Sequence, residues 1–272
     1  MLLKQKVKQS LEFLQPQIKE IPKTTLVLGS GLGGIADAVE DPLVIPTADI
    51  PHYPVSTVPG HAGKWIIGEL AGTNVLVIQG RVHFFEGYSL QQVTYPVHVL
   101  AGLGIKNLIL TTACGGLNPD FTPGDLMIIT DHINMGFGNP LIGAPDNLLG
   151  NRFPDMSKPY DPRLIEIAEK VGEEENAPFK KGVFCWVTGP SYETAAEVRL
   201  FQSLGGDAVS MSTVPEVIVA VQRHLSVLGI SMITNSATGI SKTDLSHSEV
   251  IHMANIAGKK LGSLLQKIIQ KI

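Results

Sequence analysis

Two segments of the sequence combine residue types that could bind an oxyanion. Arg81 and His83 stand two positions apart in residues 79–87, which read Gln-Gly-Arg-Val-His-Phe-Phe-Glu-Gly. If this segment is extended, both side chains lie on one face and form a cationic clamp for phosphate oxygens. Residues 26–34 pass into a glycine-rich turn, where Ser30 and successive backbone N–H groups can also hold an anion. The Arg81 segment favours an anion site, although Arg81 could instead pair with a structural carboxylate.

The glycines of residues 26–34 also fit a different ligand. Gly29, Gly31 and Gly34 have the spacing of the dinucleotide-binding fingerprint, but the acidic residue expected about 20 residues later is not clearly placed after a second strand. On this segment alone, phosphate, a dinucleotide and a tight turn without a ligand are about equally supported. The Ser30 hydroxyl slightly favours phosphate.

Five more segments place polar groups at turns or after apolar runs. They are His61 at a Pro-Gly turn, the glycine-rich residues 111–119 with Cys114, Glu193 before a helix start, Ser212 and Asn235. Each has a structural alternative: an exposed loop histidine, a core cysteine, a charge at a helix N-terminus, a helix cap, or an amide that braces its own turn. Because several strands end in such loops, we expect the loops to meet at one edge of a sheet as one pocket.

Several common catalytic classes lack their motifs in this sequence. It has no His-Glu-x-x-His metal spacing, no Walker lysine loop and no Gly-x-Ser-x-Gly elbow. We therefore expect no metal site, and we set aside metallohydrolases, common NTPases and α/β-hydrolases.

Composition limits the partners and the compartment. The 272 residues are 44% hydrophobic, and 21 basic against 25 acidic residues give a net charge of −4. A nucleic acid or an anionic membrane surface binds a basic face, so we expect neither as a partner. Cys114 and Cys185 form no disulfide framework, which favours a reducing cytosol. Residues 1–22 lack a signal-peptide core and no uncharged apolar run could span a bilayer, so we expect a cytoplasmic protein.

Short apolar, β-branched runs alternate with helical patterns along the chain. The runs are residues 25–28, 75–78, 108–111, 126–130, 183–187, 208–211 and 227–234. Most are continuously apolar, which is typical of strands covered on both faces in an α/β protein. The helical patterns are residues 90–102, interrupted by Pro96, and residues 162–171, 194–204, 215–224 and 246–272. We expect one α/β domain over residues 1–272, with a central mixed, twisted β-sheet flanked by helices.

The order of the motifs resembles one known family. Gly-Ser-Gly-Leu-Gly, Val-Pro-Gly-His-Ala-Gly, Gly-Arg-x-His-x-x-Glu-Gly, Gly-Gly-Leu-Asn-Pro, Asp-His-Ile-Asn, Arg-Phe-Pro-x-Met-Ser, Gly-Pro-x-x-Glu-Thr, Met-Ser-Thr-Val-Pro-Glu and Thr-Asn follow one another between residues 25 and 250. In this order they are similar to the motifs of the trimeric, low-molecular-mass purine nucleoside phosphorylases. The resemblance implies a phosphorylase/hydrolase-like sheet.

The resemblance also implies a role for each candidate residue. The implied phosphate ligands are Ser30, His61, Arg81, His83, the Ala113 backbone N–H and Ser212. The implied purine contacts are Tyr192, Glu193, Val209, Met211 and Asn235. The implied ribose contacts are Phe85, Met211, His247 and, from a neighbouring subunit, Phe153. His83, Glu193 and Asn235 are the implied catalytic residues, and the shared sugar site implies a homotrimer.

The implied reaction is the reversible phosphorolysis of 6-oxopurine ribonucleosides and deoxyribonucleosides, such as inosine and guanosine, in purine salvage. The products are the free base and (deoxy)ribose 1-phosphate, so inorganic phosphate is a co-substrate and no cofactor is needed. Asn235 distinguishes the chain from the sister methylthioadenosine phosphorylases, which carry an acidic residue there. Three alternatives stay open: a dinucleotide-binding module, a nucleoside hydrolase, whose Asp-rich calcium site we do not find, and an inactive oligomer with the loop-rich residues 119–160 as its interface.

Overall fold

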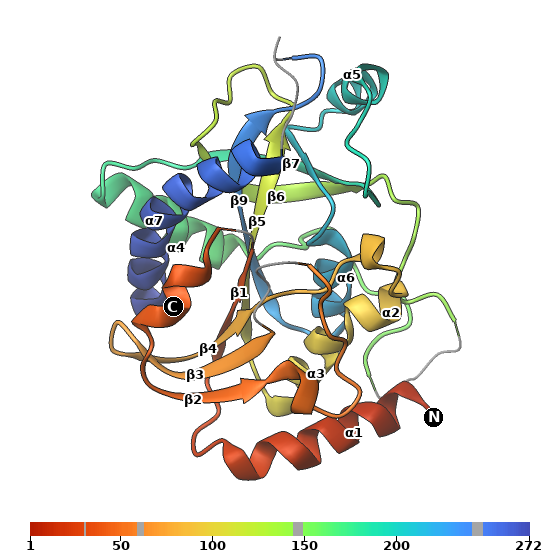
Figure 1. Cartoon of the computed structure of the whole chain (residues 1–272), viewed down its shortest axis with the longest axis vertical. Helices are drawn as coiled ribbons and strands as arrows, with labels where there is room; N and C mark the ends of the chain where they lie inside the picture. The colour runs from red at the N-terminus through yellow and green to blue at the C-terminus, as the bar shows by residue number, and fades with distance from the viewer. Residues whose placement is uncertain (30, 59–62, 144–148, 241–246) are drawn as a thin grey trace.

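The computed structural model of the chain describes residues 1–29, 31–58, 63–143, 149–240 and 247–272. Within these residues nine strands form one sheet in the order β2-β3-β4-β1-β5-β8-β7-β6-β9, and β5 also pairs with β9 (Figure 1). The strands are β1 (Thr24–Leu28), β2 (Glu40–Pro46), β3 (Lys64–Leu70), β4 (Thr73–Gln79), β5 (Asn107–Gly116), β6 (Leu126–Asn134), β7 (Lys180–Trp186), β8 (Ala208–Ser210) and β9 (Ser226–Ser236). The second pairing of β5 joins β5, β8, β7, β6 and β9 into a closed ring.

The sheet is mixed, as the sequence analysis predicts. Neighbours β1–β4, β1–β5, β5–β9, β6–β7 and β7–β8 are parallel, whereas β2–β3, β3–β4, β5–β8 and β6–β9 are antiparallel. All seven predicted apolar runs are strands. The analysis missed β2 and β3. β2 is an edge strand in which only Ile45 is buried, whereas β3 carries the buried run Trp65, Ile66 and Ile67, which the analysis did not recognise.

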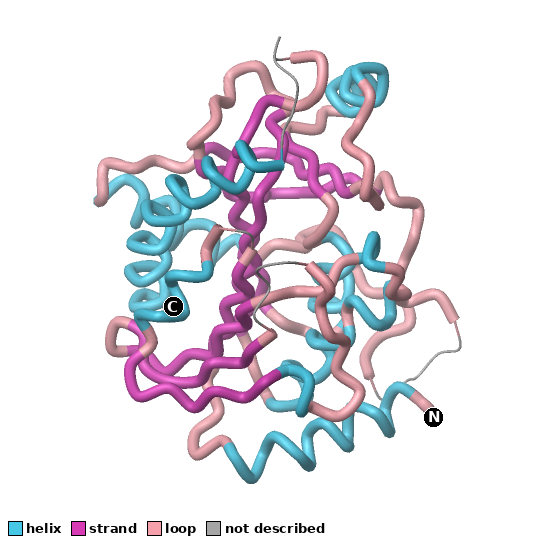
Figure 2. Tube along the Cα trace, viewed as in Figure 1, coloured by secondary structure: helices cyan, strands magenta, loops and turns pink. Residues whose placement is uncertain are grey.

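Helices cover both faces of the sheet, which appears in magenta between cyan helices in Figure 2. They are α1 (Leu3–Leu14), α2 (Leu90–Val93), α3 (Tyr95–Leu103), α4 (Pro162–Glu174), α5 (Ala195–Ser203), α6 (Val214–Gln222) and α7 (His247–Lys271). Helices α4 and α7 pack together on one face, and α3 and α6 pack on the other, with α1 against α3 (Figure 1). None of the helices in the described part of the chain is long and apolar enough to cross a membrane.

Five helical patterns in the sequence correspond to helices of the structure. Pro96 divides the predicted helix 90–102 into α2 and α3. It occupies the first turn of α3, where a backbone N–H would have no partner within the helix, so proline is tolerated. The predicted capping box of α5 is present, since Glu197 accepts from the Thr194 N–H over 2.7 Å. The analysis did not predict α1.

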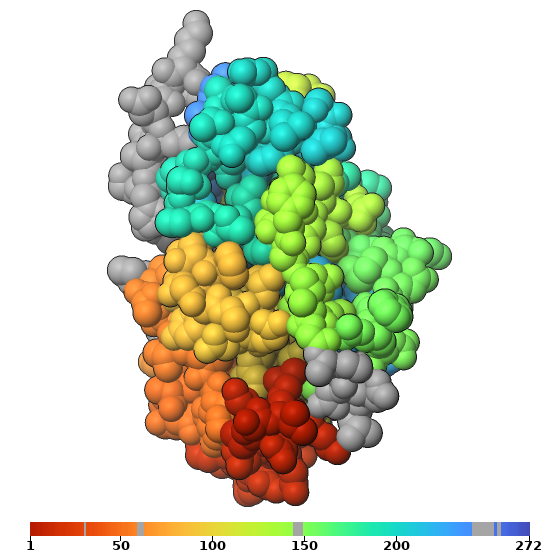
Figure 3. Space-filling model, turned by 90° about the vertical axis from the view of Figure 1, so that its right-hand side faces the viewer, coloured from red at the N-terminus to blue at the C-terminus, as the bar shows by residue number. Residues whose placement is uncertain are grey.

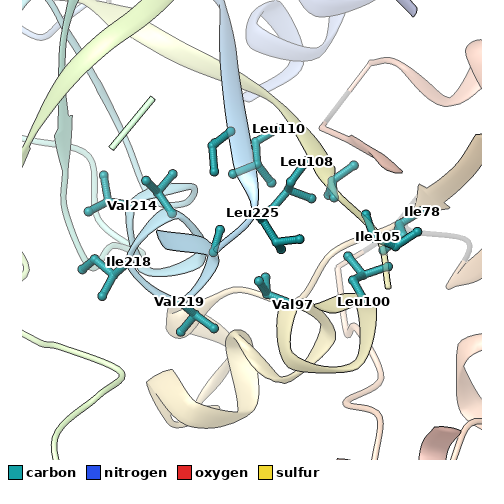
Figure 4. Packing of buried hydrophobic residues seen from close by; sticks show 14 of the residues in the cluster. Ile78, Val97, Leu100, Ile105, Leu108, Leu110, Val214, Ile218, Val219 and Leu225 are labelled. Atoms are coloured by element: carbon teal, nitrogen blue, oxygen red, sulfur yellow. The ribbon is translucent and has the colours of Figure 1, made fainter. Parts of the chain in front are cut away.

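The continuous apolar runs feed two cores because successive strand residues point to opposite faces. Val27, Leu108 and Leu110 face α3 and α6, whereas Leu26 and Ile109 face the side of α4 and α7. Figure 4 shows Leu108 and Leu110 packed against side chains of α3 and α6. Both faces of the central strands are therefore buried away from solvent, which explains why these strands carry no alternating polar pattern.

Strand β1 comes very close to β5 where the glycine-rich turn begins. The Gly29 N–H donates to Thr111 Oγ1 over 2.9 Å, and the same hydroxyl donates to Val27 O over 2.8 Å. A Cβ added at Gly29 would lie 2.6 Å from the Thr111 carbonyl oxygen. Glycine is required here because the turn leaves β1 in contact with the neighbouring backbone.

Gly29→Ala should therefore lower the free energy of unfolding by about 1–3 kcal/mol, because the added methyl group overlaps a backbone oxygen that cannot withdraw. Gly34→Ala is the matched control in the same turn, since a Cβ there meets nothing within 4 Å. We expect the control to be neutral or to gain up to about 1 kcal/mol. Urea unfolding of both variants measures the difference, and equal effects would contradict the close contact between β1 and β5.

Candidate active site

The sheet brings polar residues of separate strands into one cleft. Strands β1, β4, β5 and β9 run parallel, so their carboxyl ends lie at the same edge. The cleft encloses about 880 Å³ including its open mouth. It is lined by Val58, Arg81, His83, Phe85, Thr112, Ala113, Cys114, Gly115, Tyr192, Glu193, Val209, Ser210, Met211, Ser212, Thr234 and Asn235.

Both groups of residues predicted from the sequence meet in this cleft. The expected phosphate ligands found in its lining are Arg81, His83, Ala113 and Ser212. All five expected purine contacts line it as well: Tyr192, Glu193, Val209, Met211 and Asn235. Phe85, one of the expected ribose contacts, also lines the cleft. Ser30, His61 and the side chain of His247 lie outside what the structure describes. Phe153 is absent from the described lining and is 87% exposed, with the Arg152 guanidinium 5.8 Å from its ring centroid.

Arg81 lies between the cleft and the protein interior and is 7% exposed. Its Nη2 donates to Ser212 Oγ over 2.8 Å and to Thr111 O over 3.4 Å. Its Nη1 lies 3.3 Å from Glu216 Oε2. The structural alternative from the sequence is thus present, because Arg81 pairs with the buried carboxylate of Glu216. Arg81 also lines the cleft, where an anion could reach it.

Hydroxyl groups hold the ends of β5 and β8 together beside Arg81. Ser212 Oγ lies 3.0 Å from Thr112 Oγ1, and Ser210 Oγ donates to Ala113 O over 2.8 Å. The alternative that Ser212 caps a helix is wrong, because α6 begins at Val214 and Thr213 holds the N-cap position. Ser212 instead faces the guanidinium.

The backbone turns sharply at Thr213, directly after Ser212. Thr213 has φ +79° and ψ −56°, and the Val214 N–H donates to Ser212 O over 3.0 Å. These values describe a γ-turn with positive φ, a rare and strained conformation for a β-branched residue. Such strain is found mostly at functional sites.

A carboxylate orients His83. Glu86 Oε1 accepts the His83 backbone N–H over 2.6 Å and lies 3.1 Å from His83 Nδ1, while Oε2 accepts the Thr57 N–H over 2.6 Å. Burial raises the pKa of Glu86, but the hydrogen bonds from Thr57 and His83 outweigh burial and hold that pKa below its ordinary value. The His83 ring also stacks on Phe85, with ring centroids 4.8 Å apart. The imidazole orientation is therefore fixed from two sides.

Glu193 stands just before α5 in a partly buried position. Burial raises the pKa of its carboxyl group, its own backbone N–H partly offsets that rise, and the nearby Glu197 adds to it. Burial also raises the pKa of the neighbouring Tyr192 hydroxyl, and Glu193 adds to that shift. Among the cleft residues, Glu193 is the carboxylate best placed to accept hydrogen bonds from a ligand.

The Asn235 amide has a defined orientation at the end of β9. Its Nδ2 donates to Ser236 O over 3.0 Å, and its Oδ1 accepts from Thr234 Oγ1 over 2.9 Å. A carbonyl can only accept, so the nitrogen must face Ser236. These contacts match the alternative in which the amide braces its own turn. An amide has two N–H groups and two oxygen lone pairs, so each atom can serve a ligand as well.

Two loops meet where Met211 contacts Gly189. Gly189 has φ +64°, and a Cβ there would lie 2.3 Å from Met211 Sδ. Glycine therefore lets the loop before Tyr192 lie against the loop after β8.

The sequence analysis did not assign roles to Thr112, Glu86 or Glu216. The two glutamates follow His83 and Thr213 by three positions, which is the spacing of a capping box. That spacing could have identified both glutamates from the sequence. Thr112 carries no such signal, because its hydroxyl partner, Ser212, is 100 residues away in the chain.

The comparisons with known proteins agree with this geometry. The sequence pattern of the Phosphorylase superfamily matches residues 23–270. Purine nucleoside phosphorylase 1 of Bacillus subtilis is 52% identical over 251 residues, which cover 92% of this chain and 93% of the relative. Purine nucleoside phosphorylase of Rattus norvegicus is 42% identical over 275 residues, covering 97% and 94%.

Solved structures give the same result. The crystal structure of Schistosoma purine nucleoside phosphorylase in complex with hypoxanthine has a TM-score of 0.93 and 36% identity, covering 98% of this chain and 97% of that one. The structure of the Schistosoma mansoni enzyme in complex with inosine also has a TM-score of 0.93, with 36% identity and coverage of 98% and 96%. The α/β fold class predicted from the sequence is confirmed.

The sheet, the cleft at its edge and the sequence pattern place the chain in the Phosphorylase superfamily. Within it, identities of 52% and 42% over nearly the whole chain show that it belongs to the purine nucleoside phosphorylases. It is thus an enzyme of the pentosyltransferase class, as the resemblance of its motifs implied.

The raised pKa of Glu193 predicts a pH-dependent effect of its removal. Above the folded-state pKa the carboxylate is ionised in a partly buried site, which lowers stability, whereas below about pH 4 the folded and unfolded forms are both neutral. Glu193→Gln should therefore raise the Tm at pH 7 to 8, and the gain should vanish as the pH falls toward 4. Thermal unfolding between pH 4 and 8 measures this.

The matched control is Glu197→Gln in the same helix start. Hydrogen bonds from Thr194 lower the pKa of Glu197, so its charge is favourable in the folded state. We expect no rise in the Tm of this control at neutral pH. A Glu193→Gln variant with wild-type Tm across the range would contradict the burial of an unfavourable charge.

Proposed function

We propose that the protein catalyses the reversible phosphorolysis of 6-oxopurine ribonucleosides and deoxyribonucleosides, such as inosine and guanosine, in purine salvage. The products are the free base and (deoxy)ribose 1-phosphate. One observation supports this above all: the donors around Arg81 and the pair Glu193 and Asn235 line a single cleft. An anion and a purine bound to these two groups can then approach the same sugar.

The Arg81 side of the cleft has the chemistry of a site for inorganic phosphate. Arg81 supplies planar, charged N–H donors, and the Ser212 hydroxyl lies 2.8 Å from one of them. His83 and the Ala113 backbone N–H add donors along the same lining. We assign Ser30 and His61, which lie outside the described residues, to this site on the resemblance alone.

Asn235 has the chemistry to bind the edge of a 6-oxopurine. Its amide oxygen can accept from the N7–H group of the departing base while its amide nitrogen donates to O6. These contacts strengthen as negative charge builds on the base, so they lower the barrier rather than only hold substrate. A 6-amino group would place two donors against each other at a cost of about 1–3 kcal/mol, which favours inosine and guanosine over adenosine.

Glu193 completes the purine site on our assignment. Its carboxylate can accept from N1–H and from the 2-amino group of guanine. Tyr192, Val209 and Met211 supply the flanking surface of the cleft. Removing a partly buried, ionised carboxylate from water is unfavourable, and a purine that donates two hydrogen bonds offsets that cost.

The reaction follows from holding the two substrates together. The C1′–N9 bond stretches toward an oxocarbenium-like sugar and breaks, and its electron pair moves to the purine. N7 takes up from solvent the proton that hydrogen phosphate releases as it bonds to C1′. A phosphate oxygen held by Arg81, His83 and Ser212 stabilises the positive sugar and then bonds to C1′. Positioning therefore takes the place of a protein nucleophile.

The only thiol in the described cleft lining is poorly suited to attack. Cys114 is 4% exposed, and its Sγ lies 3.3 Å from Met232 O. Burial raises the pKa of this thiol to about 12, so it stays protonated at neutral pH. Bound phosphate is the better nucleophile.

Ligands of related enzymes support a purine nucleoside as substrate. Schistosoma structures contain hypoxanthine and inosine. One is a complex with adenosine, and an isoform is a complex with cytosine and ribose 1-phosphate. A panel of nucleosides is therefore needed to establish the preference that Asn235 predicts.

We propose a homotrimer in which Phe153 closes the sugar site of a neighbour, and in which Phe85, Met211 and His247 line the ribose. Phe153 is 87% exposed and Phe137 is 86% exposed, and aromatic residues are enriched at interfaces between subunits. Figure 3 shows residues 135–143 and 149–158, in lime and green, along one face beside the golden segment that contains α2. Exposed aromatic side chains in these segments suit contact with another subunit.

The proposal includes no cofactor and no metal, because phosphate supplies the nucleophile and Asn235 stabilises the leaving base. We also propose that the protein works in the cytoplasm. Cys114 and Cys185 are both buried, unpaired thiols, which suits a reducing compartment.

The reaction should depend strictly on inorganic phosphate. We expect release of hypoxanthine and ribose 1-phosphate from inosine only when phosphate is present, and faster turnover of inosine and guanosine than of adenosine. Chromatography of a nucleoside panel with and without phosphate measures both. Equal turnover in phosphate-free buffer would indicate a hydrolase, and equal rates with adenosine would contradict the role of Asn235.

Phe153→Ala should raise the KM for nucleoside by roughly tenfold if this ring covers a neighbour's sugar, because burial of a phenylalanine is worth about 1.5–3 kcal/mol. Val44→Ala is the control, since Val44 is an exposed apolar residue on edge strand β2. Co-expression of Phe153→Ala with Asn235→Ala should restore activity, because mixed trimers contain sites with both residues intact. Failure of both effects would remove Phe153 from the sugar site.

A further inference from the structure

Glu216, in the first turn of α6, connects the two unusual features beside the cleft. It is 5% exposed, and its Oε2 accepts the Thr213 N–H over 2.9 Å while lying 3.3 Å from Arg81 Nη1. Glu216 is not among the described residues that line the cleft. Arg81 and Ser212 do line it. Glu216 Oε2 contacts Arg81 directly, and it is connected to Ser212 through the backbone turn at Thr213.

Two features that lower the stability of the fold lie at Glu216 Oε2: a buried charge and a strained turn. Burial raises the pKa of Glu216, and the Arg81 guanidinium and the Thr213 N–H only partly offset that rise. A buried ion pair is often no more stabilising than apolar residues of the same volume. Thr213 is fully buried in its strained γ-turn. Stability alone gives no reason for this combination, so a role in the adjacent site is the better explanation.

We propose that Glu216 is a positioning residue for the phosphate site, where its carboxylate holds the Arg81 guanidinium and the Ser212 hydroxyl in one fixed geometry. This rests on the proposed function, in which phosphate binds to Arg81 and Ser212. Glu216 itself touches neither substrate.

The contacts explain how one carboxylate can fix two donors. The guanidinium is planar, so Glu216 at Nη1 and Ser212 at Nη2 together set its plane and its rotation. The hydrogen bond from Thr213 to Glu216 holds the turn that directs Ser212 Oγ toward Nη2. Phosphate then binds to donors that need no rearrangement.

A purely structural role for Glu216 is the alternative, and the chain offers a way to separate the two. Glutamate three residues after Thr213 is a capping box, and glutamine serves equally well in that motif. Glu216→Gln therefore keeps an acceptor for the Thr213 N–H but removes the ion pair with Arg81. Glu197→Gln is the matched control, because Glu197 accepts the Thr194 N–H at the start of α5 in the same way and has no guanidinium partner within the described part of the chain.

The test compares the KM for phosphate with the KM for inosine. In Glu216→Gln we expect the KM for phosphate to rise roughly tenfold or more, as for loss of a hydrogen bond to a charged group, with the KM for inosine changed less than about twofold. Glu197→Gln should leave the KM for phosphate unchanged. An unchanged or lowered KM for phosphate in Glu216→Gln, or an equal rise in both constants, would overturn the proposal.

Two further measurements keep the proposal falsifiable if Glu216→Gln folds poorly. Glu216→Asp keeps the charge but is one methylene shorter, so it cannot reach both partners, and it should also raise the KM for phosphate selectively. The increase in Tm on adding inorganic phosphate should shrink in each variant relative to wild type. An increase equal to that of wild type would contradict the proposal.

A double-mutant cycle shows whether Glu216 acts through the cleft residues. Ser212→Ala combined with Glu216→Gln should raise the KM for phosphate less than the product of the two single effects, because both changes loosen the same pair of donors. Fully multiplicative effects would mean that Glu216 acts elsewhere. If wild-type turnover itself does not require phosphate, the proposed function fails and these comparisons lose their basis, which is a separate result.

Discussion

The parallel pairing of β1, β4, β5 and β9 is the constraint on which the rest of the structure depends. Parallel strands end at a common edge, so each apolar run delivers the polar residues that follow it to the same place. Residues separated by more than 100 positions, such as Thr112 and Asn235, thereby line one cleft. Any register change in these strands would disperse the site.

The same edge carries several unfavourable interactions. The guanidinium of Arg81 is buried beside Glu216, Thr213 is held in a strained turn, and burial raises the pKa of Glu193. Two dry cores, one on each face of the central strands, hold these groups in place. A rigid apolar core beneath a strained and charged cleft is the expected arrangement when a site must be formed before the substrate binds.

The chemistry of the cleft divides between its two sides. The side of Arg81, His83 and Ser212 offers donors for an anion, whereas Glu193 and Asn235 offer acceptors and an amide for a heterocycle. The Cys114 thiol between them is kept neutral by burial, and burial raises its pKa to about 12. An enzyme of the purine nucleoside phosphorylase family can therefore act through the placement of two substrates, without a covalent protein intermediate.

The sequence by itself determined the buried strands and most helices, because continuous apolar runs and proline or capping signals are local properties of the chain. It also identified the residues that follow those strands and the family to which the chain belongs. Only the tertiary structure decided the closure of β5 onto β9, the edge strand β2 and the pairing of Arg81 with Glu216. Those features depend on contacts between residues far apart in the chain, and no local pattern encodes which carboxylate will lie 3.3 Å from a given guanidinium.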